Sequence, residues 1–351
     1  MINYKEIKTK NTLMITIQRI VGTLLFSAVL LLTSCSENKL EIDVSDISIH
    51  SELIRFDSIL FEPEPNTASS EAHNLFNKYP QFAPIYFEHV IKVGNPYSSE
   101  FEDLLGLFLT EYEIRMSYVK GMELYDDFSN YKKPIDKAFR HYRYYFPEKP
   151  VPHIYTMISG FNQSIVVADS VLAISLDKFL GADNRYYDQL QIANYLRTRM
   201  QPKAIPFEAL KGWISTEFEF GGETKNLVSH MIHHGKLLYL MDALFPNAND
   251  QQKIGYSEAE IQWSEKSEDQ VWLYLMDKKL LFDGKRMLIK RFIEEAPFTG
   301  PFGKNSPGRL GQWMGWQIVR SYMDKNSEVT IPELMNNYNY QQILLNSGYN
   351  P

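Results

Sequence analysis

Residues 154–176 read IYTMISGFNQSIVVADSVLAISL, which contains three short apolar runs rich in β-branched side chains and separated by polar residues or glycine. Runs of this length predict strands, and the short connections between consecutive runs favour an antiparallel meander. The stretches before and after them carry apolar residues at helical spacing. We therefore predict an α+β fold that is mainly helical, with a small antiparallel meander surrounded by helices.

Local signals place the ends of several other elements. Residues 47–61 suggest a strand followed by a turn, and the prolines that follow break the chain. Pro134 is expected to open a helix, and another helix is expected to start near Ser306. Capping boxes, in which serine or threonine is followed three residues later by glutamate, predict helix starts at Ser99-x-x-Glu102, Ser257-x-x-Glu260 and Thr330-x-x-Glu333.

The N-terminus has the features of a secretory signal. Four basic residues precede an apolar run at 20–32 that is too short for a mature membrane anchor, and Leu32-Thr33-Ser34 leads to Cys35. Cys35 is the only cysteine, so it has no disulfide partner within the chain. Its position resembles the lipobox of bacterial lipoproteins, where the cysteine is acylated and becomes the new N-terminus. A soluble secreted protein and an uncleaved N-terminal anchor are the alternatives.

This interpretation divides the chain into three parts. Residues 1–34 are expected to form a lipoprotein signal peptide, residues 35–46 a lipidated tether, and residues 47–351 a single α+β domain. An acylated Cys35 carries several chains, which is enough for stable membrane attachment. We therefore expect a membrane-anchored lipoprotein of the cell envelope that faces the periplasm, on either the inner or the outer membrane.

The composition limits the partners of this domain. Hydrophobic residues make up 44% of the chain and aromatic residues 14%, which indicates a sizeable core. The formal charge of −7 becomes about −10 without the signal, which holds four basic residues and one acidic residue. This acidity argues against nucleic acid as a partner, because phosphate binding requires clustered lysine and arginine. It also gives no polybasic support for membrane contact beyond the lipid.

Histidines at 230, 233 and 234 are the obvious candidates for a metal site. His230 and His234 share the i, i+4 spacing of the zinc motif H-E-x-x-H, but Met231 stands where that motif has its glutamate. Without this carboxylate no general base activates a zinc-bound water. We therefore predict no catalytic residue, no metal and no cofactor, and take these histidines as hydrogen-bonding residues of a helix surface or end.

A loop at 297–307 followed by a glycine- and tryptophan-containing helix is the candidate contact surface. Glycines at helical spacing allow another backbone to approach closely, which most often means core packing and otherwise a partner-binding face. All five tryptophans lie in the C-terminal half of the chain. The residues proposed for this surface are Pro301, Gly303, Lys304, Arg309, Gly311, Trp313, Gly315 and Trp316.

Two blocks of sequence resemble the gliding-motility lipoprotein family GldB. Residues 226–246 read NLVSHMIHHGKLLYLMDALFP and are followed by IGYS at 254–257, and residues 295–317 read EAPFTGPFGKNSPGRLGQWMGWQ. The resemblance covers essentially the whole chain, including the lipobox at Cys35. It implies a protein of gliding Bacteroidota that acts with other gliding lipoproteins in the envelope, supporting the motility machinery and the associated type IX secretion apparatus.

The order of helices and meander is also similar, more distantly, to a family of predicted zinc peptidases. There an H-E-x-x-H helix follows the meander, and a later helix carries a third, acidic ligand before a glycine. The corresponding first helix would lie at 207–218, which holds no histidine, and the third-ligand position would lie close to His234. This resemblance implies a degenerate zincin-like scaffold that lacks the catalytic set, an analogy at the level of the fold alone.

These observations favour a lipid-anchored envelope protein that works by protein–protein contacts and is not an enzyme. Two alternatives stay open at this point. One is a metal-dependent hydrolase that uses His230 and His234, and the other is a binder of envelope glycans or peptides that uses the aromatic-rich C-terminal half.

Overall fold

A computed structural model describes residues 38–63 and 68–351. Its contacts divide the chain into two units, Met1–Glu41 and Ile42–Pro351. In the first unit the backbone N–H of Leu40 donates to Asn38 Oδ1 at 3.1 Å. Cys35 and the predicted signal peptide lie outside the described residues, so both stay predictions, as does the domain boundary at residue 47. The fold described below is that of the second unit.

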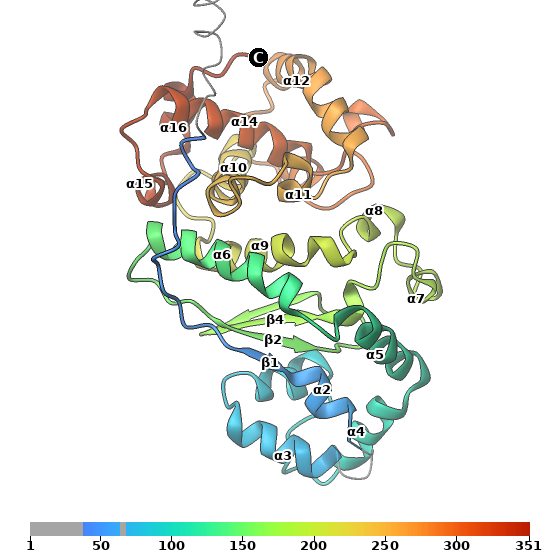
Figure 1. Cartoon of the computed structure of the whole chain (residues 1–351). Coiled ribbons are helices and arrows are strands. Elements are labelled where there is room, and N and C mark those ends of the chain that lie inside the picture. Colours follow the sequence, from blue (N-terminus) through green and yellow to red (C-terminus); the bar gives the residue numbers. More distant parts are fainter. Residues whose placement is uncertain (1–37, 64–67) are drawn as a thin grey trace, which may run out of the picture. The chain divides into compact units, whose positions relative to one another are not determined.

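A four-stranded sheet lies at the centre of the domain (Figure 1). Its strands are β1 (Leu53–Arg55), β2 (His153–Met157), β3 (Ile165–Ala168) and β4 (Val171–Ser175), in the order β1-β2-β4-β3. β1 and β4 both pair with β2 in parallel, and β3 pairs antiparallel with β4. The mainly helical α+β class is confirmed, with a mixed sheet.

The predicted antiparallel meander is wrong in its strand order. A meander would place β3 between β2 and β4, but β4 takes that central position and only β3–β4 form a hairpin. Burial explains the difference, because every residue of β4 is buried whereas every residue of β3 is only half-buried. The strand that is buried along its whole length takes the place covered on both faces, and β3 is left at the edge.

Helices cover both faces of the sheet. In Figure 1 one side is covered by N-terminal helices, whose aromatic rings pack together, as in Phe56 against Phe82 with ring centroids 5.0 Å apart. These elements are α2 (Phe56–Phe61), α3 (Ala68–Lys78), the π-helix η2 (Ile85–Val90), α4 (Phe101–Thr110) and α5 (Tyr112–Tyr125). The other side is covered by α6 (Ser129–Tyr145) and α9 (Ile205–Glu217), which contact each other and, through α9, strands β3 and β4.

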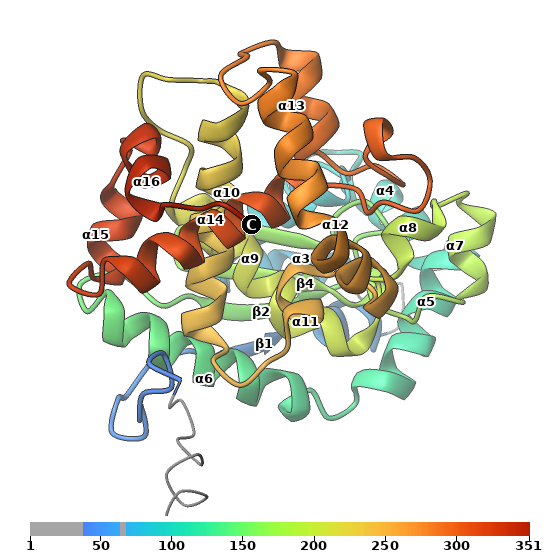
Figure 2. The ribbon, with the colours of Figure 1, turned by 90° about the horizontal axis from the view of Figure 1, so that it is seen from above.

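Short elements connect the sheet to α9, and a helical layer follows it. The connecting elements are η3 (Leu176–Lys178), α7 (Arg185–Gln189), α8 (Asn194–Arg197) and η4 (Pro202–Ala204). In Figure 2 the C-terminal helices are seen in front of the sheet. They are α10 (Leu227–Leu244), α11 (Asp250–Ile254), α12 (Glu258–Asp277), α13 (Arg286–Ile293), η5 (Gly300–Phe302), α14 (Leu310–Lys325), α15 (Ile331–Asn336) and α16 (Tyr340–Ser347).

Helices α10 and α14 approach each other backbone to backbone. A Cβ atom added at Gly235 would lie 2.1 Å from the carbonyl oxygen of Gly315, and one added at Gly315 would lie 1.7 Å from the carbonyl oxygen of Met231. Only glycine permits this distance, because any side chain would meet a main-chain atom that cannot rotate away. The two helices therefore form one tightly packed pair at the centre of the C-terminal layer.

Most of the predicted contact surface is core. Gly311, Trp313, Gly315 and Trp316 are buried within α14, and Arg309 is 7% exposed. The prediction of a partner surface is therefore wrong for the four α14 residues, and the core-packing alternative accounts for the glycines. Arg309 lines a cleft that is described below. Pro301 is half-buried, and only Gly303 and Lys304 are exposed.

Several predicted helix ends are also corrected. The capping boxes at Ser257 and Thr330 are present, but α4 begins at Phe101 without a side-chain cap. Pro134 lies inside α6, which begins five residues earlier. Residues 53–61 form a short strand and a helix, and α14 begins at Leu310 beyond a loop that includes Pro307. Phe101 at the start of α4 and Leu310 at the start of α14 are both fully buried, so packing decides where these two helices begin.

Substitution of Gly315 by alanine is expected to destabilise the domain by about 3 kcal/mol or more, because the α10–α14 backbones must separate. Gly106 in α4 is the matched control, since no atom lies within 4 Å of a Cβ added there. Gly106→Ala is expected to stabilise by about 0.5–1 kcal/mol through helix propensity. Chemical denaturation of both variants measures these changes. A fully stable Gly315→Ala protein would contradict the packing described here.

Candidate functional site

A cleft of about 330 Å³ lies where α9, α10 and the start of β3 meet. Its lining combines polar and ionisable side chains with a few aliphatic ones, and it draws on segments that are far apart in the sequence. The lining residues are Ser164, Ile165, Arg199, Glu208, Lys211, Gly212, Ser215, His234, Leu237, Leu238, Glu295, Arg309 and Gln312.

Close packing brings α9 onto the edge strand beside this cleft. A Cβ atom added at Gly212 would lie 2.8 Å from Cγ2 of Ile165 and 3.8 Å from Cγ2 of Val167. The missing side chain lets the helix rest directly on these two residues of β3. Because Ile165 also lines the cleft, the contact fixes the edge strand at its rim.

A buried carboxylate holds the loop that leads into β3. Asp177, directly after β4, accepts hydrogen bonds from the backbone N–H groups of Ser159 at 3.2 Å and Phe161 at 2.6 Å, and from the hydroxyl of Ser175. Burial raises the pKa of Asp177, while these donors act in the opposite direction. Ser159 and Phe161 lie in the segment that joins β2 to β3, so Asp177 helps to fix where the edge strand begins.

Ion pairs fill the wall of the cleft. Lys211 Nζ lies 2.5 Å from Glu208, one turn earlier in α9, and Arg199 contacts the same carboxylate at 3.4 Å. Arg199 also pairs with Glu295 at 2.6 Å, and Arg309 reaches Glu295 at 3.2 Å. The five side chains form one network of three cations and two carboxylates. Such a network holds its charges at fixed positions, and each charged group is paired with a group of opposite charge.

The pKa of Glu208 shows that this carboxylate is held ionised. Burial acts to raise its pKa, but Lys211 and Arg199 outweigh this effect and the pKa is lowered. Burial lowers the pKa of Lys211, against the attraction of Glu208. A carboxylate stabilised by two cations is a weak base, so the arrangement favours binding over proton abstraction.

His234 is the one ionisable side chain of the cleft without a polar partner in the described part of the chain. Burial lowers its pKa to about 4, and the charges of His230 and Arg309 add to this effect. The imidazole is therefore neutral near pH 7. It offers the cleft one hydrogen-bond donor and one acceptor next to the cation Arg309.

His230 and His233 belong to an aromatic cluster. His230 stacks on Phe220 with centroids 4.1 Å apart and an interplanar angle of 2°, and His233 meets the edge of the same ring at 5.3 Å. Among residues 38–63 and 68–351, no group of three or more His, Cys, Asp or Glu side chains is arranged to hold a metal ion. The structure thus brings His234 to the cleft and places His230 against Phe220.

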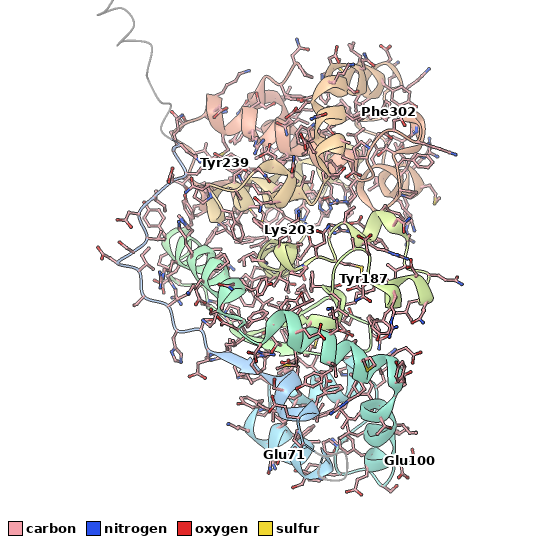
Figure 3. The ribbon with its side chains drawn as sticks, turned by 45° about the vertical axis from the view of Figure 1, so that its right-hand side comes forward. Glu71, Glu100, Tyr187, Lys203, Tyr239 and Phe302 are labelled. Carbon is pink, nitrogen blue, oxygen red and sulfur yellow. The ribbon has the colours of Figure 1, made fainter. Side chains whose placement is uncertain are left out.

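A second cleft of about 290 Å³ shares Arg199 and Glu208 with the first. Lys203, Gln251 and Glu258 are among its other lining residues. Figure 3 shows Lys203 midway along the domain, between Tyr187 on one side and the C-terminal helices on the other. The Arg199–Glu208 pair therefore forms a shared wall between two adjacent polar clefts.

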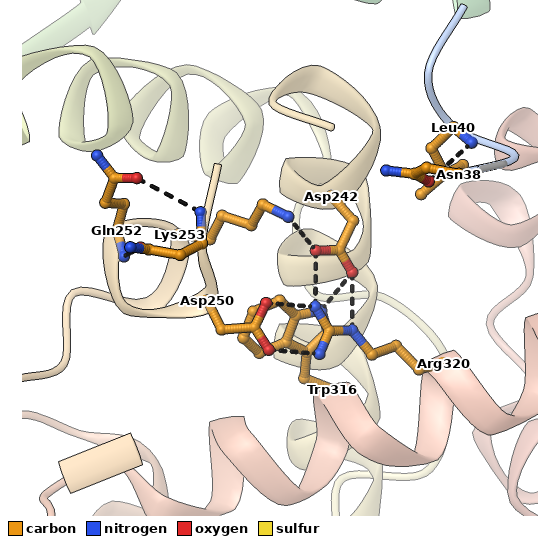
Figure 4. Close-up of polar contacts among 9 residues, drawn as sticks. Asn38, Leu40, Asp242, Asp250, Gln252, Lys253, Trp316 and Arg320 are labelled. Atoms are coloured by element: carbon orange, nitrogen blue, oxygen red, sulfur yellow. Dashed lines mark hydrogen bonds and ion pairs between the residues drawn. The ribbon is translucent and has the colours of Figure 1, made fainter. Parts of the chain in front are cut away.

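Asp242 in α10 is a structural hub (Figure 4). Its carboxylate accepts from Trp316 Nε1 at 2.9 Å and Arg320 Nε at 2.9 Å, and it pairs with Lys253 at 2.9 Å. Arg320 also forms a bidentate pair with Asp250, at 2.6 and 2.8 Å. All the polar groups of this cluster bond to one another and join α10, α11 and α14. The cluster therefore has a structural role.

Sequence reasoning missed most residues of the cleft. Glu208 and Lys211 stand one turn apart in a predicted helix, which is a common surface pattern. The stretch Phe207-Glu-Ala-Leu-Lys211 has the length of H-E-x-x-H, with glutamate in the second place and no histidine at either end. Arg199 and Glu295 carry no local signal, because only the tertiary fold brings them to α9.

Comparison with known proteins places the chain in a family. The model of the family described as gliding motility protein GldB matches residues 37–351. The chain belongs to the GldB family. Membership implies a part in gliding motility, and the family's label as a lipoprotein family indicates a membrane-anchored protein of the envelope. No curated protein and no solved structure matches, so the zincin-like scaffold stays a prediction.

The lengths and compositions of the described helices bear on membrane crossing. Within residues 38–63 and 68–351, none combines the length and the apolar character that a membrane crossing requires.

The buried histidines are expected to make the domain less stable in mild acid. The pKa of His233 is lowered to about 3 by burial, His234, Lys236 and His230, and that of His234 to about 4. The unfolded chain takes up protons first as the pH falls below about 6.5, so stability is lost between about pH 6.5 and 4. Replacing both by glutamine is expected to reduce this slope by about 1.4 kcal/mol per pH unit for each histidine.

Urea denaturation at several pH values measures that slope. His50→Gln is the matched control, because the His50 side chain is 81% exposed. An unchanged slope in the double variant would show that these two histidines do not control the acid response.

Proposed function

We propose that this GldB-family protein is a lipid-anchored, non-enzymatic component of the cell envelope. It acts by contacts with other gliding and secretion lipoproteins, and it supports assembly of the motility machinery and of type IX secretion. The family match supports the gliding role, and the lipobox supports anchoring through Cys35 on the periplasmic side. An acyl anchor raises the local concentration of the domain next to other anchored proteins. The acidic composition speaks against nucleic acid as a partner.

The ion-paired cleft supports a binding role over catalysis, and it is the observation on which this proposal depends. Glu208 is held ionised by Lys211 and Arg199, and the lowered pKa of His234 makes its neutral imidazole a weak base. Among the described residues, the lining also has no group of side chains arranged to hold a metal ion. No specific observation favours the hydrolase alternative. The peptide-binding alternative is compatible with the same cleft. In this proposal, binding of a peptide segment of a partner protein in the cleft is how the two proteins contact each other.

Strand β3 offers a partner segment a place to pair. It is the edge of the sheet, and Ser164 and Ile165 at its start line the cleft. The backbone N–H of Ser175 donates to the carbonyl of Ser164, so hydrogen-bonded pairs recur at every second residue and the N–H groups of Ile165 and Val167 point away from β4. An extended peptide can add to such an edge while its side chains meet the charged wall.

Acylation of Cys35 is the first prediction of this proposal. Mass spectrometry of the protein from envelope fractions is expected to give a diacylglyceryl-modified Cys35 as the first residue. Cys35→Ser is expected to keep residues 1–34, to lack lipid, and to reduce spreading of a gliding strain that carries no other copy. Detection of an unmodified Cys35 at the mature N-terminus would contradict the anchor.

The edge strand is tested by Val167→Pro, which removes the outward N–H while the pairing with β4 persists. Val167→Ala is the control, because it loses the same side-chain packing and keeps the N–H. We expect both variants to be acylated and to fold, as judged by thermal melting. Only the proline variant should lose gliding and the envelope proteins that co-purify with the parent. If cells that carry a correctly folded Val167→Pro protein glide normally, a role for this edge is refuted.

A further inference from the structure

A cationic surface stands out on this acidic chain at the end of α12, the following loop and α13. Residues 276–293 hold six basic residues and two acidic ones, whereas the whole chain has a formal charge of −7. All six cations are exposed. They are Lys278, Lys279, Lys285, Arg286, Lys290 and Arg291, and together with Phe282 and Met287 they are called the α13 surface below.

Most of this charge has no internal partner. Lys285 pairs with Asp283 at 3.1 Å and Lys290 with Glu294 at 3.2 Å, both at exposed positions. Within the described residues, no carboxylate pairs with the other four cations, which are Lys278, Lys279, Arg286 and Arg291. The four are therefore available to an anion outside the chain.

Large apolar side chains protrude among these cations. Phe282 is 58% exposed and Met287 is 71% exposed. On α13 the exposed residues Arg286, Met287, Lys290 and Arg291 share one face at helical spacing, while Phe292 on the opposite face is buried. Cations around protruding apolar tips are the pattern of segments that lie in the headgroup region of a bilayer.

The surface is held in place by the core. The carbonyl of Leu281 accepts from the backbone N–H of Val228 at 2.9 Å, and that of Asp283 accepts from Leu227 at 3.0 Å, so the loop caps the N-terminus of α10. Phe302 lies against Phe292 and Tyr274, which joins the 300–304 loop to the same elements. In Figure 3 Phe302 lies at the opposite end of the domain from Glu71 and Glu100.

We propose that the α13 surface binds the anionic phospholipid surface of the membrane to which the protein is anchored. The inference rests on the proposed function for its lipid anchor, which keeps the domain within reach of the bilayer. Charge complementarity favours lipid headgroups, and the protruding Phe282 and Met287 favour a soft bilayer over a rigid acidic protein. The earlier expectation of no polybasic support beyond the lipid is corrected, because net charge averages over a surface that is locally basic.

The test uses the acylated, mature chain on vesicles with a fluorophore at a single site. Cys35 is the only cysteine and its thiol is acylated, so Met287→Cys provides one reactive thiol for a bimane probe. The vesicles contain phosphatidylcholine alone or phosphatidylcholine and phosphatidylglycerol in equal parts, with brominated acyl chains as quencher. Leu107→Cys is the matched control site, since Leu107 is 68% exposed on α4.

We expect quenching at 287 on phosphatidylglycerol vesicles, little on phosphatidylcholine, and loss of quenching in high salt. Quenching at 107 should be absent on both. Replacing Lys278, Lys279, Arg286 and Arg291 by glutamine should weaken the contact about fivefold per cation. The same change at Lys78, Lys133, Lys137 and Lys203, which lies outside the α13 surface, should leave it intact.

Several outcomes would overturn the proposal. One is a probe at 287 that stays unquenched on phosphatidylglycerol vesicles. Another is an equal loss of quenching at 287 in the two sets of glutamine variants, which would show that binding depends on net charge alone. A third is protection of the probe only when an envelope protein is added, which would assign the surface to an acidic protein partner.

Mass spectrometry of the same sample reports acylation, so failure of the anchor is distinguished from failure of the surface. If Cys35 is unmodified, the probe is placed on the Cys35→Ser background and the vesicles are recovered by flotation. Quenching at 287 on phosphatidylglycerol then supports the proposal, and its absence refutes it.

Discussion

The direct contact between the backbones of α10 and α14 is the constraint on which the C-terminal layer depends. Gly235 and Gly315 remove the side chains that would hold the helices apart, and the short distance allows Asp242 to reach Trp316 and Arg320. With α10 fixed in rotation, His234 faces the cleft while His230 lies against Phe220. Packing of two glycines thus decides which histidine is available to a ligand.

Electrostatics then determine what the cleft can do. The carboxylates that could serve as bases, Glu208 and Glu295, are both paired with cations, and the remaining imidazole is neutral. Few charges in this wall are unpaired. The polar groups of a ligand must therefore replace one partner of an existing ion pair. Recognition by this means is selective and need not be tight. The free edge of β3 supplies the less specific part of the interaction through main-chain hydrogen bonds.

Two surfaces with different chemistry are therefore present on one domain. The cleft beside β3 is ion-paired and concave, whereas the α13 surface is cationic and carries protruding apolar side chains. A lipid anchor fixes only one point of the chain, and contact of a second surface with the bilayer would restrict the orientations of the domain. Restricted orientation raises the effective concentration of the cleft for a partner held at the same membrane.

Local patterns and motifs were enough to predict the fold class, the family and two of the capped helix starts correctly, and they also predict the anchor at Cys35. The sequence also contained the cationic run at 276–293, which a chain-wide charge hides. Tertiary structure alone decided the strand order, the burial of Gly311 and Trp313, and the meeting of Arg199, Glu208 and Glu295. Strand order follows from burial on both faces, and the ion network joins residues that are distant in sequence, so no local pattern encodes either.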